Sequence, residues 1–95
     1  MAKIIIVEDE AIIADEIQMM LEMLGHTVVA NIQNGDRALD AFVSKKPDIA
    51  LLDITIKGSK SGIDLARIIR RKHNFPFVFL TSHSDRATLA DVKTT

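Results

Sequence analysis

The sequence predicts an α/β domain with a flavodoxin-like, doubly wound and mainly parallel sheet. Patterns typical of strands and helices alternate four times along the 95 residues, without a repeat, a linker or a low-complexity segment. The apolar runs at residues 4–7 and 49–52 are rich in Ile, Leu and Val, which suits strands that are covered on both faces. Right-handed crossovers between such strands place helices on both faces of the sheet. A chain of this length forms one small domain.

The first strand, helix and second strand are expected within residues 1–30. Residues 1–7 predict a strand, and residues 11–24 predict a helix because their apolar side chains follow helical spacing. The expected inward side chains of this helix are Ile13, Ile17, Met20 and Leu24. Gly25 lies where a helix C-terminus commonly needs a left-handed residue, and residues 27–30 predict a short β-branched second strand.

The second helix is expected between Asn34 and Pro47. Asn34 is a good N-terminal cap, and Pro47 cannot continue a helix. The expected inward face of this helix consists of Ala38, Leu39, Phe42 and Val43. Residues 49–52 then predict the third strand.

The last third of the chain predicts a loop over residues 55–61, a helix over residues 63–71 and a strand over residues 77–80. A fourth helix, capped by Ser84, is expected to reach Val92. No further strand would then protect one edge of the sheet, so we expect a domain that is truncated at its C-terminal side.

Composition excludes several classes of function. The 12 basic and 13 acidic residues give a net charge of -1, which offers no field that would attract nucleic acid or an anionic membrane. The chain has no cysteine, which excludes disulfides, thiolate metal sites and a cysteine nucleophile. No apolar run is long enough for a signal-peptide core or a membrane span. We therefore expect a soluble cytoplasmic protein whose chemistry lies at a local site.

Acidic residues follow two of the predicted buried strands. Glu8 and Asp9 come directly after the first strand, and Asp53 closes the third. The carboxyl ends of parallel strands open into the crevice where α/β sheets bind ligands, so these carboxylates should converge there. Two like charges about 4 Å apart repel by roughly 4 kcal/mol at an effective dielectric near 20, so such a cluster favours a bound cation. Mg²⁺ is the expected ion, because it prefers carboxylates, waters and phosphate oxygens.

The same arrangement suits phosphoryl transfer. An ionised Asp53 can attack phosphorus and form an aspartyl phosphate, and Thr81 follows the fourth strand at the same edge, where its hydroxyl can donate to a phosphoryl oxygen. Each acid taken singly is explained equally well as a helix cap or a solvated side chain, and Thr81 alone is better explained as a cap. The functional hypothesis depends on their occurring together.

The motifs in this order resemble the receiver domain of two-component response regulators. The similarity rests on the runs IIIVEDE, LLDI and FLTSHSD on successive strand ends, with NGDRAL at 34–39 and GIDLA at 62–66. It covers nearly the whole chain and implies the strand order 2-1-3-4, normally followed by a fifth strand and a fifth helix. We therefore expect residues 1–95 to be a receiver domain that is incomplete at its C-terminus.

The resemblance also implies roles for individual residues. Glu8 and Asp9 match the acidic pair of the family, Asp53 matches the phosphoacceptor, and Thr81 matches the hydroxyl that contacts the phosphoryl group. Thr55 matches the position whose backbone carbonyl completes the coordination of Mg²⁺. The implied partners are a histidine kinase or phosphotransfer protein as donor, and an output domain or effector protein as target. A dedicated enzymatic activity, direct nucleic acid binding and membrane binding are not expected.

The chain also departs from the family pattern. Receivers carry a lysine and an aromatic residue on the fifth strand, and the chain stops before that strand; Lys93 lies in the predicted fourth helix and is no substitute. Many receivers have proline where Lys57 stands, and the loop between Asp53 and Gly62 is one residue longer than the commonest form. The missing lysine leaves open a second hypothesis, a receiver-like interaction module that binds partners without phosphorylation.

Other features of the sequence allow further interpretations. A phosphohydrolase with an aspartate nucleophile would need a second acid at the position of Thr55. Met19 and Met23 would suit an adaptable docking surface, whereas Met20 is expected in the core. An exposed sheet edge makes a homodimer a reasonable expectation. A basic cluster is explained by its place at a helix C-terminus, where the macrodipole favours cations; it consists of Arg67, Arg70, Arg71 and Lys72.

Overall fold

The computed structural model describes residues 1–56 and 58–80. Over these residues the strands are β1 (Lys3–Val7), β2 (Thr27–Ile32), β3 (Ile49–Asp53) and β4 (Phe77–Leu80). The helices are α1 (Ala11–Met23), α2 (Gly35–Lys45) and α3 (Gly62–Lys72). Thr81 and the predicted fourth helix, which includes Ser84 and Lys93, lie outside the described residues.

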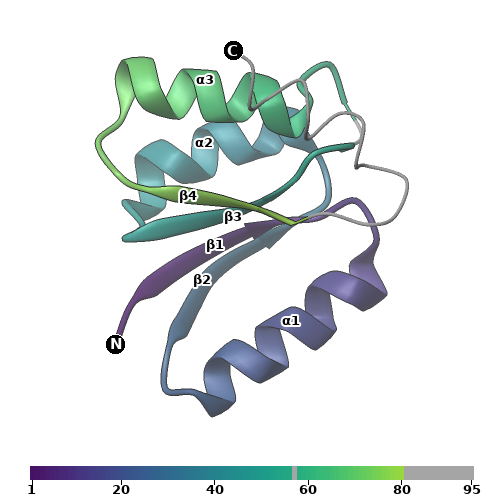
Figure 1. Cartoon of the computed structure of the whole chain (residues 1–95), viewed down its shortest axis with the longest axis vertical. Coiled ribbons are helices and arrows are strands. Elements are labelled where there is room, and N and C mark those ends of the chain that lie inside the picture. The colour runs from purple at the N-terminus through teal and green to yellow at the C-terminus, as the bar shows by residue number, and fades with distance from the viewer. Residues whose placement is uncertain (57, 81–95) are drawn as a thin grey trace.

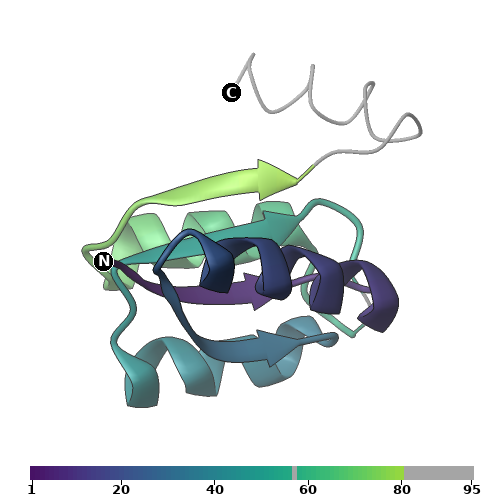
Figure 2. The ribbon, with the colours of Figure 1, turned by 90° about the horizontal axis from the view of Figure 1, so that it is seen from below.

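The described strands form one parallel sheet in the order β2-β1-β3-β4, which confirms the predicted fold class and strand order. Figure 2 shows the four arrowheads pointing to the same edge of the sheet. In Figure 1, α2 and α3 cover one face of the sheet and α1 covers the other. The sheet is therefore wound on both sides, and its carboxyl edge is common to all four strands.

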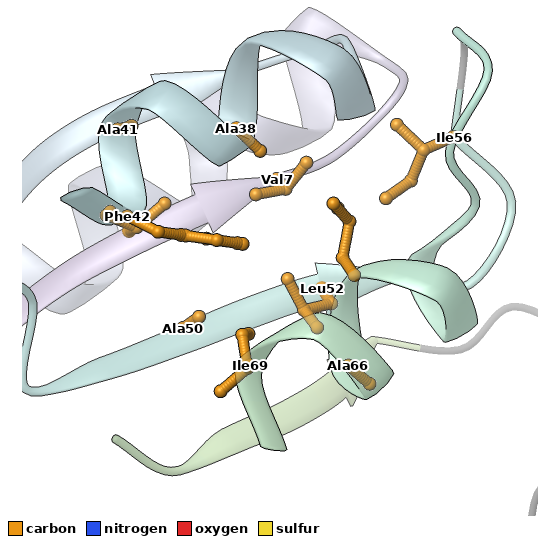
Figure 3. Close-up of a cluster of buried hydrophobic side chains, with 11 residues drawn as sticks. Val7, Ala38, Ala41, Phe42, Ala50, Leu52, Ile56, Ala66 and Ile69 are labelled. Carbon is orange, nitrogen blue, oxygen red and sulfur yellow. The ribbon is translucent and has the colours of Figure 1, made fainter. Parts of the chain in front are cut away.

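The larger core lies between the sheet and the pair α2 and α3. Its sheet layer comes from β1 and β3, and Phe42 is the largest side chain buried in it. Figure 3 shows Phe42 reaching from α2 across the strands, while Ile69 enters the same layer from α3. Ile56, from the loop after β3, belongs to this cluster as well. The buried members are Ile5, Val7, Ala38, Ala41, Phe42, Ala50, Leu52, Ile56, Leu65, Ala66 and Ile69.

The predicted inward face of α1 was wrong for most of its residues. Met20 is 58% exposed and Leu24 is 74% exposed, whereas Ala14 is fully buried against Ile4 and Ile6 of β1. The other α1 side chains that pack on this smaller core are Ile17 and Leu21. Apolar residues occupy more than half of the circumference of α1, so helical spacing alone fits more than one face. Packing selected the face where the small side chain of Ala14 meets the sheet.

The helix ends agree better with the sequence. Asn34 caps α2, and its Oδ1 accepts from the N–H groups of Asp36 (2.8 Å) and Arg37 (3.4 Å). Gly25 follows α1 with φ 93, in the left-handed region expected of it. In α2, Val43 was expected inward and is instead 64% exposed. The buried face of α2 includes Ala38, Ala41 and Phe42. It is rotated toward earlier residues relative to the predicted face.

Candidate functional site

The site lies where β1 and β3 end side by side. The two strands pair in parallel with Val7 opposite Leu52, so the next residues along each strand are Glu8 and Asp53. The backbone of Glu8 also continues toward β2, because its N–H donates to the carbonyl of Ile32 at 2.9 Å. The pairing of β1 on both sides and this hydrogen bond to Ile32 hold Glu8 at the carboxyl edge of the sheet. The backbones of Glu8 and Asp53 therefore lie on neighbouring strands at the same edge, as expected from the sequence for these two acids.

Glu8 is an acid in a buried setting. Its side chain is only 7% exposed, and among the described residues it is the one buried polar or charged side chain. Its Oε2 accepts from the N–H of Glu10 at 3.0 Å, which fixes the side chain beneath the turn before α1. A second hydrogen bond joins its carboxyl group to that of Asp53. A buried carboxylate needs such partners, because desolvation penalises its charged form.

Asp53 is half-buried and has an unusual acidity. Burial raises its pKa to about 7, and the hydrogen bond and negative charge of Glu8 act in the same direction. The backbone N–H groups of Thr55 and Asp9 oppose the rise by donating to the Asp53 carboxylate, and the Thr55 N–H lies 3.3 Å from Oδ1. The outcome is an acidic pair that holds a proton near neutral pH when nothing else balances its charge.

The predicted magnesium ligands are assembled in part. Glu8 and Asp53 meet through their side chains, while Asp9 and Thr55 reach Asp53 through their backbone N–H groups. Within residues 1–56 and 58–80 no group of three or more His, Asp or Glu side chains is arranged as a metal site. The paired carboxylates nevertheless fit Mg²⁺, because oxygen donors carrying excess negative charge are what this ion binds. The roles of the Asp9 carboxylate and the Thr55 carbonyl stay predictions.

The loop after Asp53 is fixed at both ends. Ile54 and Ile56 are buried, so Thr55 between them is directed to the surface. Gly62 returns to the start of the loop, and its N–H donates to the Ile54 carbonyl at 2.9 Å. A Cβ on Gly62 would lie 2.0 Å from the Asp53 carbonyl oxygen, so only glycine permits this approach. The GIDLA motif therefore includes a residue that packs directly on the backbone of the phosphoacceptor candidate.

Two local features near the site were missed from the sequence. Ser61 and Asp64 form a capping box at the start of α3, in which the Ser61 hydroxyl accepts from the Asp64 N–H at 3.2 Å and the Asp64 Oδ2 accepts from the Ser61 N–H at 3.0 Å. The spacing S-x-x-D before an apolar run was the available signal. The second feature is the hydrogen bonding between Asp36 and Ser59, which are 23 residues apart. No sequence pattern predicts this contact. Thr81, the predicted phosphoryl contact, lies outside the described residues.

A parallel sheet in the order 2-1-3-4, with acids after its two central strands, defines the class of flavodoxin-like receiver folds. The response regulator receiver domain family matches residues 4–94, and the chain belongs to this family. Receiver domains are generally signalling modules and not dedicated enzymes. Over the described residues, no helix has both the length and the apolar character needed to cross a membrane.

Solved structures of receiver domains are similar to the chain along most of its length. The receiver domain of a modulated diguanylate cyclase from Desulfovibrio desulfuricans G20 is 33% identical with a TM-score of 0.88, over 99% of this chain and 75% of that one. The BeF₃-activated receiver domain of RstA from Klebsiella pneumoniae is 32% identical with a TM-score of 0.79, over 96% and 79%.

A third similar structure is a longer protein. The response regulator PhyR from Brucella abortus is 36% identical with a TM-score of 0.78, over 90% of this chain and 35% of that one. The chain therefore spans about a third of the length of PhyR. The likeness concerns the receiver portion of that protein, and the remaining two thirds have no counterpart in the comparison.

Proposed function

We propose that the chain is a phosphorylation-dependent receiver in which Asp53 accepts a phosphoryl group from a histidine kinase or a phosphotransfer protein. The observation that supports this most is the juxtaposition of Glu8 and Asp53, with the pKa of Asp53 raised to about 7. Structural acids at strand ends are usually solvated or used as caps, whereas the carboxyl groups of Glu8 and Asp53 are held against each other by a hydrogen bond. Such a pair suits a site that works with a metal ion.

The proposed metal ligands are the carboxylates of Glu8, Asp9 and Asp53 and the backbone carbonyl of Thr55. When bound, Mg²⁺ supplies the positive charge that replaces the proton of the acidic pair and neutralises the transferred phosphoryl group. Asp53 is then ionised and can act as a nucleophile. The N–H of Thr55 holds Oδ1 of Asp53 and so orients the carboxylate for attack.

The transfer itself requires alignment more than proton removal. A carboxylate oxygen of Asp53 forms a bond to phosphorus while the bond between phosphorus and the donor histidine nitrogen breaks, and that nitrogen keeps the electron pair. Leu80, the last residue of β4, pairs in register with Asp53, and Thr81 is the next residue in the sequence. We assign to the Thr81 hydroxyl the contact with the phosphoryl group, which biases the surface beyond β4 toward its active state.

The partners follow from the same proposal. The exposed apolar side of α1 begins directly after the acidic segment and offers the phosphodonor an adaptable surface; its exposed members are Ile12, Ile13, Met19, Met20, Met23 and Leu24. On the output side, an effector protein or an attached output domain reads the phosphorylated state. PhyR from Bartonella quintana, 35% identical, has been crystallised in complex with the anti-sigma factor NepR, which supports a protein as the target. We place the protein in the cytoplasm with its kinase.

Two-dimensional NMR with Mg²⁺ and then beryllofluoride tests the proposal. We expect shifts at Glu8, Asp53 and Thr81 that are lost in Asp53→Asn and kept in Asp40→Asn, which removes the charge of an exposed acid on α2. Beryllofluoride imitates the phosphoryl group and reports on the pocket independently of any kinase. Equal responses of wild type and Asp53→Asn would refute the assignment of Asp53.

One observation favours the second candidate, an interaction module that binds partners without phosphorylation. An Asp53 with a pKa of about 7 is largely protonated below neutral pH in the absence of metal, and a protonated carboxyl group is a poor nucleophile. The same NMR experiment separates the two functions. Mg²⁺ binding without a beryllofluoride response would favour the interaction module, whereas a response that depends on Asp53 excludes it.

A further inference from the structure

Asp36, near the start of α2, binds the loop that follows the phosphoacceptor strand. Its Oδ2 accepts from the N–H of Ser59 at 3.1 Å, and its Oδ1 accepts from the Ser59 hydroxyl. Both oxygens of one carboxylate are therefore engaged by one residue of the loop. These two bonds hold the pKa of Asp36 below its usual value, so it is anionic at neutral pH.

The backbones around this contact are close as well. A Cβ on Gly58 would lie 2.9 Å from Oδ1 of Asn34 and 3.0 Å from Oδ2 of Asp36, and its φ of 108 also favours glycine. A Cβ on Gly35 would lie 2.3 Å from the carbonyl oxygen of Lys60. The first turn of α2 and the loop thus touch at several points, and the Asp36–Ser59 pair joins them.

The other end of the loop leads directly to the site. Ile54 and Ile56 are buried, and Gly62 packs on the Asp53 backbone. Residues 54–56 can therefore shift only if core side chains move as well. Thr55 lies within this segment, and its N–H donates to Oδ1 of Asp53. The position of Thr55 is set from one side by Asp53 and the core, and from the other by the anchored residues 58–60.

We propose that Asp36 is a positioning residue for the phosphoacceptor site, which acts through Ser59 to hold the Thr55 backbone beside Asp53. The inference rests on the proposed function for its consequence, because the Thr55 carbonyl is a proposed magnesium ligand. Asp36 itself touches neither the metal nor the phosphoryl group. A merely structural role is the competing explanation, since an acid in the first turn of a helix is favoured by the macrodipole in any case.

The test compares Asp36→Ala with Asp40→Ala, which removes the same charge from an exposed position of the same helix. Loss of a group bonded directly to a metal ligand weakens metal binding by about tenfold or more, and Asp36 acts one step further away through Ser59, so we expect up to about tenfold weaker Mg²⁺ binding in Asp36→Ala by NMR titration. Asp40→Ala should bind as the wild type does. Unchanged Mg²⁺ affinity in Asp36→Ala, with only reduced stability, would overturn the proposal.

A second measurement needs no metal and separates this inference from the proposed function. Hydrogen exchange of the Thr55 amide should be about tenfold faster in Asp36→Ala, as expected for a hydrogen bond that is weakened locally, and unchanged in Asp40→Ala. If the wild type binds no Mg²⁺, the proposed metal site fails and the exchange result alone decides whether Asp36 positions Thr55. Exchange at Thr55 that is equal in the two variants would refute the positioning role.

Smaller changes guard against a general loss of structure. Asp36→Asn keeps one acceptor oxygen and Ser59→Ala keeps the backbone N–H donor, so each should give an intermediate effect on Mg²⁺ affinity and on Thr55 exchange. The double variant Asp36→Ala with Ser59→Ala should match Asp36→Ala alone, because Asp36→Ala already removes both hydrogen bonds from Ser59. Additive effects of the two changes would show that Asp36 and Ser59 act separately and would contradict the proposal.

Discussion

Replacing Asp53 by Asn should stabilise the metal-free protein at alkaline pH. The pKa of Asp53 rises from 3.8 to about 7 on folding, mainly through burial and secondly through Glu8. Between these two values the native state binds more protons than the unfolded state, so the free energy of unfolding falls as the pH rises. The stability linked to this proton is complete below about pH 4 and is lost above about pH 7. Asn keeps the shape and the acceptor oxygen of Asp53 without its charge.

The magnitude follows from the size of the shift. A shift of about three units is worth at most about 4 kcal/mol, since each unit corresponds to about 1.4 kcal/mol. Asp53 is only half-buried, and solvent screening reduces the effect to about 1 to 2 kcal/mol. Between pH 5 and pH 8, wild-type stability should therefore fall by about 1 to 2 kcal/mol more than that of Asp53→Asn.

Urea unfolding in EDTA, followed by circular dichroism at several pH values, measures this difference. Asp40→Asn serves as the control, because it removes a carboxylate of the same charge from an exposed helical position. Its stability should follow the pH dependence of the wild type. Parallel stability curves for wild type and Asp53→Asn across this pH range would refute the argument that folding raises the pKa of Asp53.

Three further predictions concern the metal, the core and the start of α3. Mg²⁺ at ten times its dissociation constant should stabilise the wild type by about 1.4 kcal/mol at pH 8 and stabilise Asp53→Asn less, as measured by thermal unfolding; equal gains would contradict the assigned ligands. Phe42→Ala should cost about 3 to 5 kcal/mol in urea unfolding, because it empties the centre of the larger core, whereas Val43→Ala on the exposed side of the same helix should change stability by less than about 1 kcal/mol. Ser61→Ala should cost about 1 kcal/mol by removing the cap of α3, with Ser44→Ala at an exposed position of α2 as its control; a loss no larger than that of the control would argue against the capping box.

Much of the fold could be predicted because each strand carries its own signal. The runs ending at Val7 and Leu52 are apolar at every position, which distinguishes buried parallel strands from the alternating pattern of half-exposed ones. Their parallel pairing then brings Glu8 beside Asp53 as a matter of geometry. The strand order itself came from the resemblance to a family, since alternation of strands and helices is compatible with several orders.

The failures share a physical cause, which is that local patterns do not specify which surfaces meet. Met20 and Leu24 fit the helical spacing of α1 as well as Ile17 does, and only packing against β1 decided between them. The contact of Asp36 with Ser59 depends on where the first turn of α2 meets a loop in space, and polar loop residues have no periodicity that would predict it. The capping box is different, because its residues are three apart and their signal was present in the sequence.

Glu8 is the residue that connects the stability of this domain most directly with its proposed function. A side chain that is 7% exposed at the end of β1 would support folding better if it were apolar, since an uncompensated buried acid is costly. The structure keeps an acid there and places it against a second acid, Asp53, whose pKa is raised by burial and by Glu8. The cation of the proposed site would reduce this repulsion, and the free energy lost to repulsion in the metal-free state would then be recovered as metal affinity. The instability of the acidic pair and its affinity for a cation are therefore two measurements of one interaction, which is why the pH dependence of unfolding reports on the proposed site without any phosphodonor.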